Sequence, residues 1–176
     1  MKAIQSIRKK IKELGGVEFS DKKTDQKIRD QVLKKMNPGE LLVDFIDNYG
    51  FGSFKKNIGF KTIEKIPVTG KNGLSEVGFI FGWSNDESGV KWHLEQLEED
   101  TIANYFPFAE GYPGDCLCIS TKMNTDKGKI YYWSHDDGEL YLVSNSFEEF
   151  IKSWEVISEE QVDLSGLIGF SLDDDL

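Results

Sequence analysis

The sequence predicts a single α+β domain with a mainly antiparallel sheet flanked by helices and an N-terminal helical extension. Three observations lead to this class. Helical periodicities fill the first fifty residues, alternating strand patterns follow, and a helix pattern returns after Ser146. The strand patterns are separated by tight turns rather than long crossovers, which favours antiparallel pairing. A length of 176 residues suits one domain with a sizeable core.

Three short helices are expected before residue 50. An apolar stripe at three- and four-residue steps predicts the first: Ile4, Ile7, Ile11 and Leu14. A narrower stripe predicts the second: Ile28, Val32, Leu33 and Met36. The third is expected to have Asn37 as its N-cap and Pro38 in its first turn, and to end at Gly50.

The strand patterns begin at Val77. Alternation of bulky residues with glycine predicts a strand over 77–83, and a second strand is expected over 116–120. The hairpin over 129–144 carries Asp137-Gly138 at its turn. Ser146 and Glu149 form a capping-box pattern that opens the last helix. The resulting faces predict that these side chains are largely buried: Phe79, Phe81, Trp83, Tyr131, Trp133, Leu140, Leu142, Phe150 and Trp154.

Charge is unevenly distributed along the chain. The formal net charge is −10, yet residues 1–36 carry 11 basic and 5 acidic side chains, which leaves 10 basic and 26 acidic for the remainder. We therefore divide the chain into a basic helical extension (1–36), an α+β body (37–157) and an acidic tail (158–176) that closes on Asp173, Asp174 and Asp175. The acidic body disfavours nucleic acid as a partner and should attract basic proteins.

Several function classes lack their sequence patterns. No apolar run reaches the length of a membrane span, and no secretory leader is recognisable. The two cysteines, Cys116 and Cys118, lie two residues apart on an expected strand, too far apart for an unstrained disulfide, which predicts reduced thiols in a cytoplasmic protein. Phosphate-binding loops are missing, and the spacing of Cys and His does not suit zinc, so neither a cofactor nor a metal is expected.

Catalytic groups are equally sparse. Ser134-His135-Asp136 resembles a triad in composition, but successive strand residues point in alternating directions and cannot converge on one substrate. His93 has no second catalytic group nearby in the sequence. We therefore expect no enzyme, and keep a hydrolase using His135 with Asp136 as a third alternative.

A mixed acidic and aromatic surface is the main functional indication. The segment from Trp83 to Asp100 contains two tryptophans and six acidic residues. This composition predicts either a solvated loop or a docking site for a basic partner. Acidic groups in connections, with an aromatic anchor nearby, give the candidate partner-binding residues: Trp83, Asp86, Glu87, Glu110, Tyr112, Asp115, Asp136 and Asp137. The alternative is that these charges are scattered and merely solvate the surface.

Five short motifs in order resemble the SUKH superfamily, which groups bacterial immunity proteins with a fungal cell-wall assembly regulator. The resemblance covers residues 37–157, and the motifs are found at residues 48–52, 79–83, 105–115, 129–136 and 146–150. The resemblance implies an antiparallel α+β domain that has no catalytic role and neutralises a toxin, often a nuclease or deaminase, by binding it. A non-enzymatic regulatory or scaffold module is the alternative. The basic extension and the acidic tail have no counterpart in this pattern.

Overall fold

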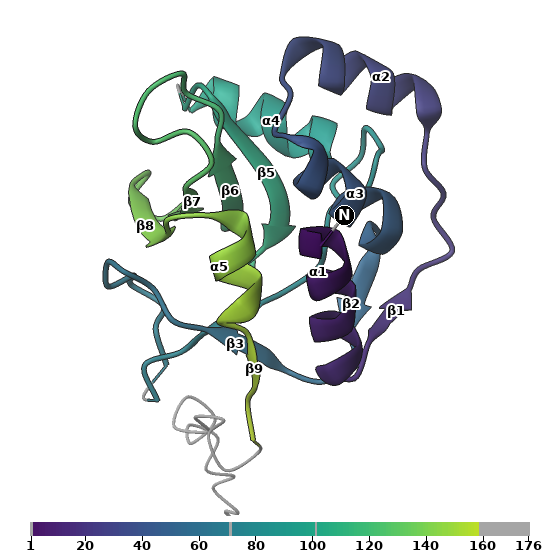
Figure 1. Ribbon diagram of the computed structural model, residues 1–176. Coiled ribbons are helices and arrows are strands. Elements are labelled where there is room, and N and C mark those ends of the chain that lie inside the picture. Colours follow the sequence, from purple (N-terminus) through teal and green to yellow (C-terminus); the bar gives the residue numbers. More distant parts are fainter. Residues whose placement is uncertain (1, 71, 101, 159–176) are drawn as a thin grey trace, which may run out of the picture.

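The computed structural model describes residues 2–70, 72–100 and 102–158 (Figure 1). Within these ranges the chain forms five helices: α1 (Lys2–Glu13), α2 (Gln26–Lys35), α3 (Glu40–Tyr49), α4 (Val90–Glu99) and α5 (Phe147–Lys152). It also forms nine strands: β1 (Val17–Phe19), β2 (Gly52–Phe54), β3 (Ile58–Phe60), β4 (Ser75–Val77), β5 (Tyr105–Glu110), β6 (Cys116–Ser120), β7 (Ile130–Trp133), β8 (Leu140–Ser144) and β9 (Glu155–Val156). The predicted α+β class is confirmed. The expected acidic tail lies outside the described residues apart from Ser158.

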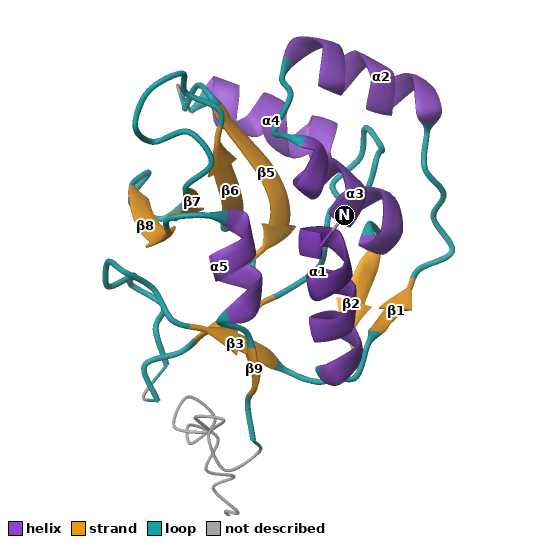
Figure 2. Cartoon of the chain, viewed as in Figure 1, coloured by secondary structure: helices purple, strands orange, loops and turns teal. Residues whose placement is uncertain are grey.

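The strands form three antiparallel sheets. The largest has the order β5-β6-β7-β8, so each strand pairs with its neighbour in sequence. A three-stranded sheet has the order β4-β3-β9, and β1 pairs with β2. Figure 2 shows helices gathered around these strands. No helix among the described residues has both the length and the apolar character needed to cross a bilayer.

The four-stranded sheet is covered on both faces, which the sequence analysis did not anticipate. Helix α4 packs against β5, and His93 on α4 reaches Cys116 of β6. On the other face α5 brings Phe147 and Phe150 against Phe108 of β5. All five residues of β6 are consequently buried.

Because helices cover both faces of the sheet, the expectation that one face of the hairpin forms the core has to be corrected. The register pairs Tyr131 with Leu142 and Trp133 with Leu140, so the four side chains share one face as predicted. Trp133 is buried, but the other three are only partly so, whereas Tyr132 on the opposite face is completely buried. A sheet with helices on both sides has no single core face, and the expectation of one was wrong for this reason.

The expected strand over 77–83 is also corrected. Strand β4 ends at Val77, and the following residues make only isolated bridges, from Ile80 to Ala109 and from Gly82 to Gly89. A Cβ on Gly82 would lie 2.4 Å from the Phe51 ring, so the glycine face is filled by a neighbouring aromatic side chain. Phe79, predicted to be buried, is partly exposed.

Helix boundaries follow local capping with one exception. Ser146 Oγ accepts a hydrogen bond from Glu149 N at 3.2 Å, as the capping pattern predicted, and α3 ends at Gly50. The N-cap of α3 is Gly39 rather than Asn37, whose side chain instead accepts from Gly39 N at 2.9 Å. Helix α4 was not predicted, because its acidic residues had suggested a loop.

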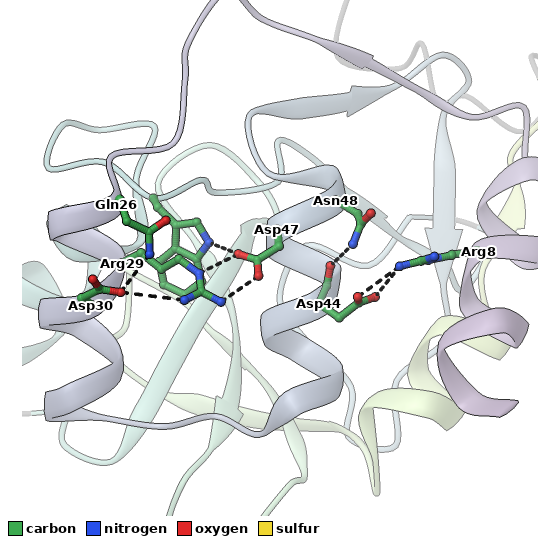
Figure 3. Close-up of polar contacts among 8 residues, drawn as sticks. Arg8, Gln26, Arg29, Asp30, Asp44, Asp47 and Asn48 are labelled. Carbon is green, nitrogen blue, oxygen red and sulfur yellow. Dashed lines mark hydrogen bonds and ion pairs between the residues drawn. The ribbon is translucent and has the colours of Figure 1, made fainter. Parts of the chain in front are cut away.

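The basic N-terminal segment is docked onto the body by ion pairs with α3 (Figure 3). Arg8 on α1 donates to Asp44 at 3.1 Å, and Arg29 on α2 contacts both Asp47 oxygens, at 2.9 and 2.8 Å. The hydrogen bond from Arg29 lowers the pKa of Asp47. Apolar side chains of α1, of α2 and of the residue directly after α1 belong to the common core: Ile7, Ile11, Ile28, Val32 and Leu14. Part of the basic charge of residues 1–36 is therefore paired with acidic side chains of α3 in the same chain.

Candidate functional site

The loop between β5 and β6 is held by a buried carboxylate. Asp115 is 2% exposed, and its Oδ2 accepts a hydrogen bond from the Tyr132 hydroxyl at 2.5 Å. Its Oδ1 accepts from His135 N at 2.9 Å and from His135 Nδ1 at 2.6 Å. The Tyr132 hydroxyl in turn accepts from Tyr112 N at 3.0 Å. These contacts fasten the loop to the end of β7.

Two glycines allow this close fit. A Cβ on Gly111 would lie 2.4 Å from the Tyr132 ring, and a Cβ on Gly114 would lie 2.9 Å from the His135 ring. Gly114 also has φ of +93°, a conformation that favours glycine. The loop therefore has one defined shape, and it presents the Tyr112 side chain to solvent, 56% exposed.

A cavity of about 420 Å³ lies beside this loop and combines aromatic and acidic walls. Its aromatic lining residues are Phe79, Phe81 and Trp92, and its carboxylates are Glu87 and Glu110. Lys22 also lines the hollow, but its ammonium is paired with Asp86 at 2.8 Å. We call this hollow the acidic cavity. Two of the predicted acidic groups, separated by more than twenty residues in sequence, therefore meet here.

Glu110 is the partly buried carboxylate of the acidic cavity. Burial raises its pKa, and backbone hydrogen bonds from Gly114 and Phe79 oppose the rise. A carboxylate that has lost water beside aromatic rings gains from a cation in the same hollow, because the cation restores the lost solvation and is attracted to the ring faces. The acidic cavity is thus suited to an ammonium or guanidinium group.

His93 forms another part of this wall and is held neutral. Burial lowers its pKa to about 4. Its Nε2 lies 2.9 Å from Glu87 O, which can only accept, so Nε2 carries the proton, and Nδ1 faces Cys116 Sγ at 3.6 Å. Burial raises the pKa of the Cys116 thiol. This is the opposite of the thiolate–imidazolium pair that a cysteine nucleophile requires.

Asp86 organises the turn before α4 and has a compensated charge. It accepts hydrogen bonds from Lys22 Nζ at 2.8 Å, Ser84 Oγ at 2.9 Å and Ser88 N at 3.0 Å. The bond from Lys22 is the main reason that the pKa of Asp86 is lowered. Asp86 therefore fixes the conformation of the turn beside the acidic cavity and adds little uncompensated negative charge there.

The hairpin end brings a further carboxylate near the loop. Asp136 Oδ1 lies 3.1 Å from His135 Nε2, so His135 bridges Asp136 and the buried Asp115. The Asp136 side chain is 78% exposed. Asp137 caps the turn instead, accepting from Glu139 N at 3.0 Å and from the Tyr141 hydroxyl at 2.7 Å.

Trp83 is not accessible as an anchor. It is completely buried, and its Nε1 donates to Asp47 Oδ1 at 2.7 Å. The Arg29 guanidinium lies 5.7 Å from its ring centroid. Trp83 and Asp115 therefore cannot touch a partner in this structure, although the sequence analysis included both among the candidate residues. Their roles are to support the fold and the loop.

The accessible candidates flank one loop. We call the set formed by Glu87, Glu110, Tyr112 and Asp136 the acidic face.

Sequence reasoning missed Phe79 and Trp92 as lining residues because it expected a buried strand for the first and did not expect α4 for the second. It noticed His135 but not its contact with Asp115, which lies twenty residues away. Among the described ranges, no group of three or more His, Cys, Asp or Glu side chains is arranged to hold a metal ion.

His135 makes stability depend on pH. The hydrogen bond to Asp115 is the main reason that its pKa is raised. A histidine with a raised pKa in the folded state contributes stability that is fully present below about pH 6.5 and is lost as pH rises through the folded pKa. We expect the stability difference between wild type and His135→Asn to shrink from about pH 6 to pH 9 in urea unfolding. His93 titrates in the opposite direction but is common to both proteins. A difference that grows with pH would contradict the assignment.

Sequence comparison identifies related proteins. A profile of the SMI1/KNR4 family (SUKH-1) matches residues 27–153, a range that includes both the loop at 110–115 and the acidic cavity from Phe79 onward. An uncharacterised protein derived from the SPbeta prophage of Bacillus subtilis (strain 168), YokK, is 32% identical over 163 residues, covering 81% of this chain and 82% of the relative. These matches confirm the resemblance drawn from the ordered motifs. The chain belongs to the SMI1/KNR4 family (SUKH-1).

Proposed function

We propose that the protein is an immunity protein that binds a basic bacterial toxin in the cytoplasm and neutralises it by covering its active site. Family membership supports the general class. The observation that carries the proposal is the acidic cavity, where Glu87 and Glu110 surround aromatic rings beside an exposed, rigid loop. Free, buried Cys116 and Cys118 are consistent with a reducing compartment.

The acidic cavity has the chemistry to receive a lysine or arginine side chain of the toxin. Its cation would lie against Trp92 or Phe79 and pair with Glu110, whose partial burial strengthens the attraction. Enzymes that grip nucleic acid place such side chains around their active sites. A protein that engages those side chains occludes the substrate path, so a nuclease or a nucleic-acid deaminase is the favoured toxin class.

Co-expression tests the proposal directly. The chain is produced together with the product of a neighbouring toxin gene, and rescue of growth with formation of a stable complex is expected. Unchanged toxicity would contradict the proposal. A pull-down that returns several partners of modest affinity, rather than one stoichiometric basic protein, would instead favour a regulatory or scaffold module.

Charge reversal on the acidic face is expected to slow association with the toxin. Combining Glu87→Lys with Asp136→Lys should reduce the association rate by roughly tenfold at low ionic strength and by less at high salt. Both side chains are exposed, so the melting temperature should change little. Surface plasmon resonance at several salt concentrations measures the effect.

A matched control separates this face from net charge. Glu99 is exposed at the opposite end of α4 from the acidic cavity, and Glu99→Lys changes the charge by the same amount per residue. It should leave the association rate nearly unchanged. Equal slowing per reversed residue at Glu99 and at the acidic face would show that only total charge matters.

A further inference from the structure

Most hydrogen-bond acceptors in the lining of the acidic cavity are already engaged within the chain. The Glu110 carboxylate accepts from the backbone N–H groups of Gly114 and Phe79. The Glu87 carbonyl oxygen lies 2.9 Å from His93 Nε2, and the Phe79 carbonyl oxygen accepts from Glu110 N at 2.8 Å. The Glu87 carboxylate belongs to an exposed residue. A cation that enters the hollow therefore meets one fixed, partly buried carboxylate and few other free acceptors.

Aromatic rings form much of the remaining lining. Phe81 and His93 stack with their ring centroids 3.7 Å apart and 18° between the ring planes, and the Trp92 ring stands at 82° to His93. The imidazole is neutral near pH 7, because burial lowers the pKa of His93 to about 4. The Lys22 ammonium is paired with Asp86. The lining therefore presents ring faces beside a carboxylate and adds no uncompensated positive charge.

Resting on the proposed function, which admits either basic side chain, we propose that the acidic cavity selects an arginine of the protein partner over a lysine. A guanidinium is planar and weakly hydrated, stacks on ring faces and forms two parallel hydrogen bonds to one carboxylate. An ammonium is compact and strongly hydrated, and its three donors each need an acceptor. Where most acceptors are engaged, the ammonium loses more hydration than the hollow can replace.

The same lining disfavours other kinds of side chain. An acidic side chain would be repelled by Glu87 and Glu110. An apolar side chain would bury Glu110 further without supplying the charge that compensates for its lost hydration. A guanidinium that lies on the Trp92 ring and donates to Glu110 satisfies both parts of the hollow, and indole is the ring that attracts cations most strongly.

Three small probes test the inference without the toxin: N-acetyl-argininamide, N-acetyl-lysinamide and the neutral analogue N-acetyl-citrullinamide, in which a urea group replaces the guanidinium. Dissociation constants are measured from the amide chemical shifts of the labelled protein. The arginine probe should bind about fivefold more tightly than the lysine probe, as expected for a partly dehydrated cation on an aromatic face. The citrulline probe should not bind measurably. Shifts should centre on residues 79–81, 87–93 and 110–114.

Substitutions separate the carboxylate from the ring. Glu110→Gln should weaken binding of both cationic probes, by about tenfold for the arginine probe. Trp92→Leu should abolish the preference for arginine, whereas Trp92→Phe should keep part of it because a ring face remains. Glu99→Gln removes the same charge at the opposite end of α4 and should leave the dissociation constants unchanged. The melting temperature of each variant checks that the fold is intact.

Several outcomes would overturn the inference. These are lysine-probe binding as tight as that of arginine, citrulline-probe binding as tight as that of arginine, a preference that survives Trp92→Leu, or equal weakening by Glu99→Gln and Glu110→Gln. Absence of shifts at the acidic cavity with the arginine probe at high millimolar concentration would do the same. Failure of toxin rescue in the co-expression experiment contradicts the proposed function but leaves the probe preference measurable, so the two proposals fail independently.

Discussion

Replacing Asp115 with alanine is expected to reduce the free energy of unfolding by about 3 to 5 kcal/mol. The carboxylate accepts three hydrogen bonds at 2.5, 2.6 and 2.9 Å from Tyr132 and His135 while being 2% exposed. Its loss leaves a buried phenol hydroxyl and a backbone N–H without their acceptor, and it releases the loop from β7. Denaturant titration followed by tryptophan fluorescence measures the change.

Two comparisons isolate the buried carboxylate. Tyr132→Phe removes one of the three donors and should cost about 1 to 3 kcal/mol. Asp136→Ala removes an exposed carboxylate from the other side of the same imidazole and should change stability by no more than about 0.5 kcal/mol. An Asp115→Ala cost as small as that of Asp136→Ala would mean that the loop is not held by this contact. Loosening of the loop should also weaken toxin binding, because Tyr112 and Glu110 lose their fixed positions.

Trp154→Ala is expected to have a similarly large effect, about 3 to 5 kcal/mol. Trp154 is 1% exposed and joins three elements, because its ring lies 6.2 Å from Phe45 of α3, 5.2 Å from Phe54 of β2 and 5.3 Å from Phe150 of α5. Alanine would leave a cavity at the point where these elements meet, and partial collapse cannot fill it. Equilibrium unfolding monitored by circular dichroism measures the loss.

Trp92 supplies a matched control for the loss of an indole. It lies on α4 and is only partly buried. Trp92→Ala should therefore cost much less, no more than about 1 to 2 kcal/mol, while it weakens cation binding in the acidic cavity. Equal costs at the two positions would contradict the central role assigned to Trp154.

Local sequence signals predicted those helices and turns that are specified by residues close together in the sequence. The stripe of Ile7 and Ile11 predicts α1, the Ser146–Glu149 cap predicts α5, and Asp137-Gly138 predicts the turn between β7 and β8. Helix α4 escaped prediction because its acidic residues masked a narrow stripe formed by Val90, Leu94 and Leu97. The family resemblance also came from short motifs, each of which depends on local order.

Contacts that build the candidate site could not be read in this way. The pairing of Asp115 with His135, the meeting of Glu87 with Glu110, and the burial of Trp83 each join segments twenty or more residues apart. The sequence selected acidic residues in connections as candidates, but it could not separate those that hold the loop from those that face solvent.

The sequence by itself determined the α+β class, the antiparallel hairpin, most helix ends and the family, because periodicity, caps and turns act over one or two turns of chain. Only the tertiary structure decided that the sheet is covered on both faces, that Asp115 and Trp83 lie inside, and that the acidic cavity forms beside the loop at 110–115. The physical reason is that burial and electrostatic environment depend on which distant segments pack together, and that packing is settled by the sum of many weak contacts across the whole core.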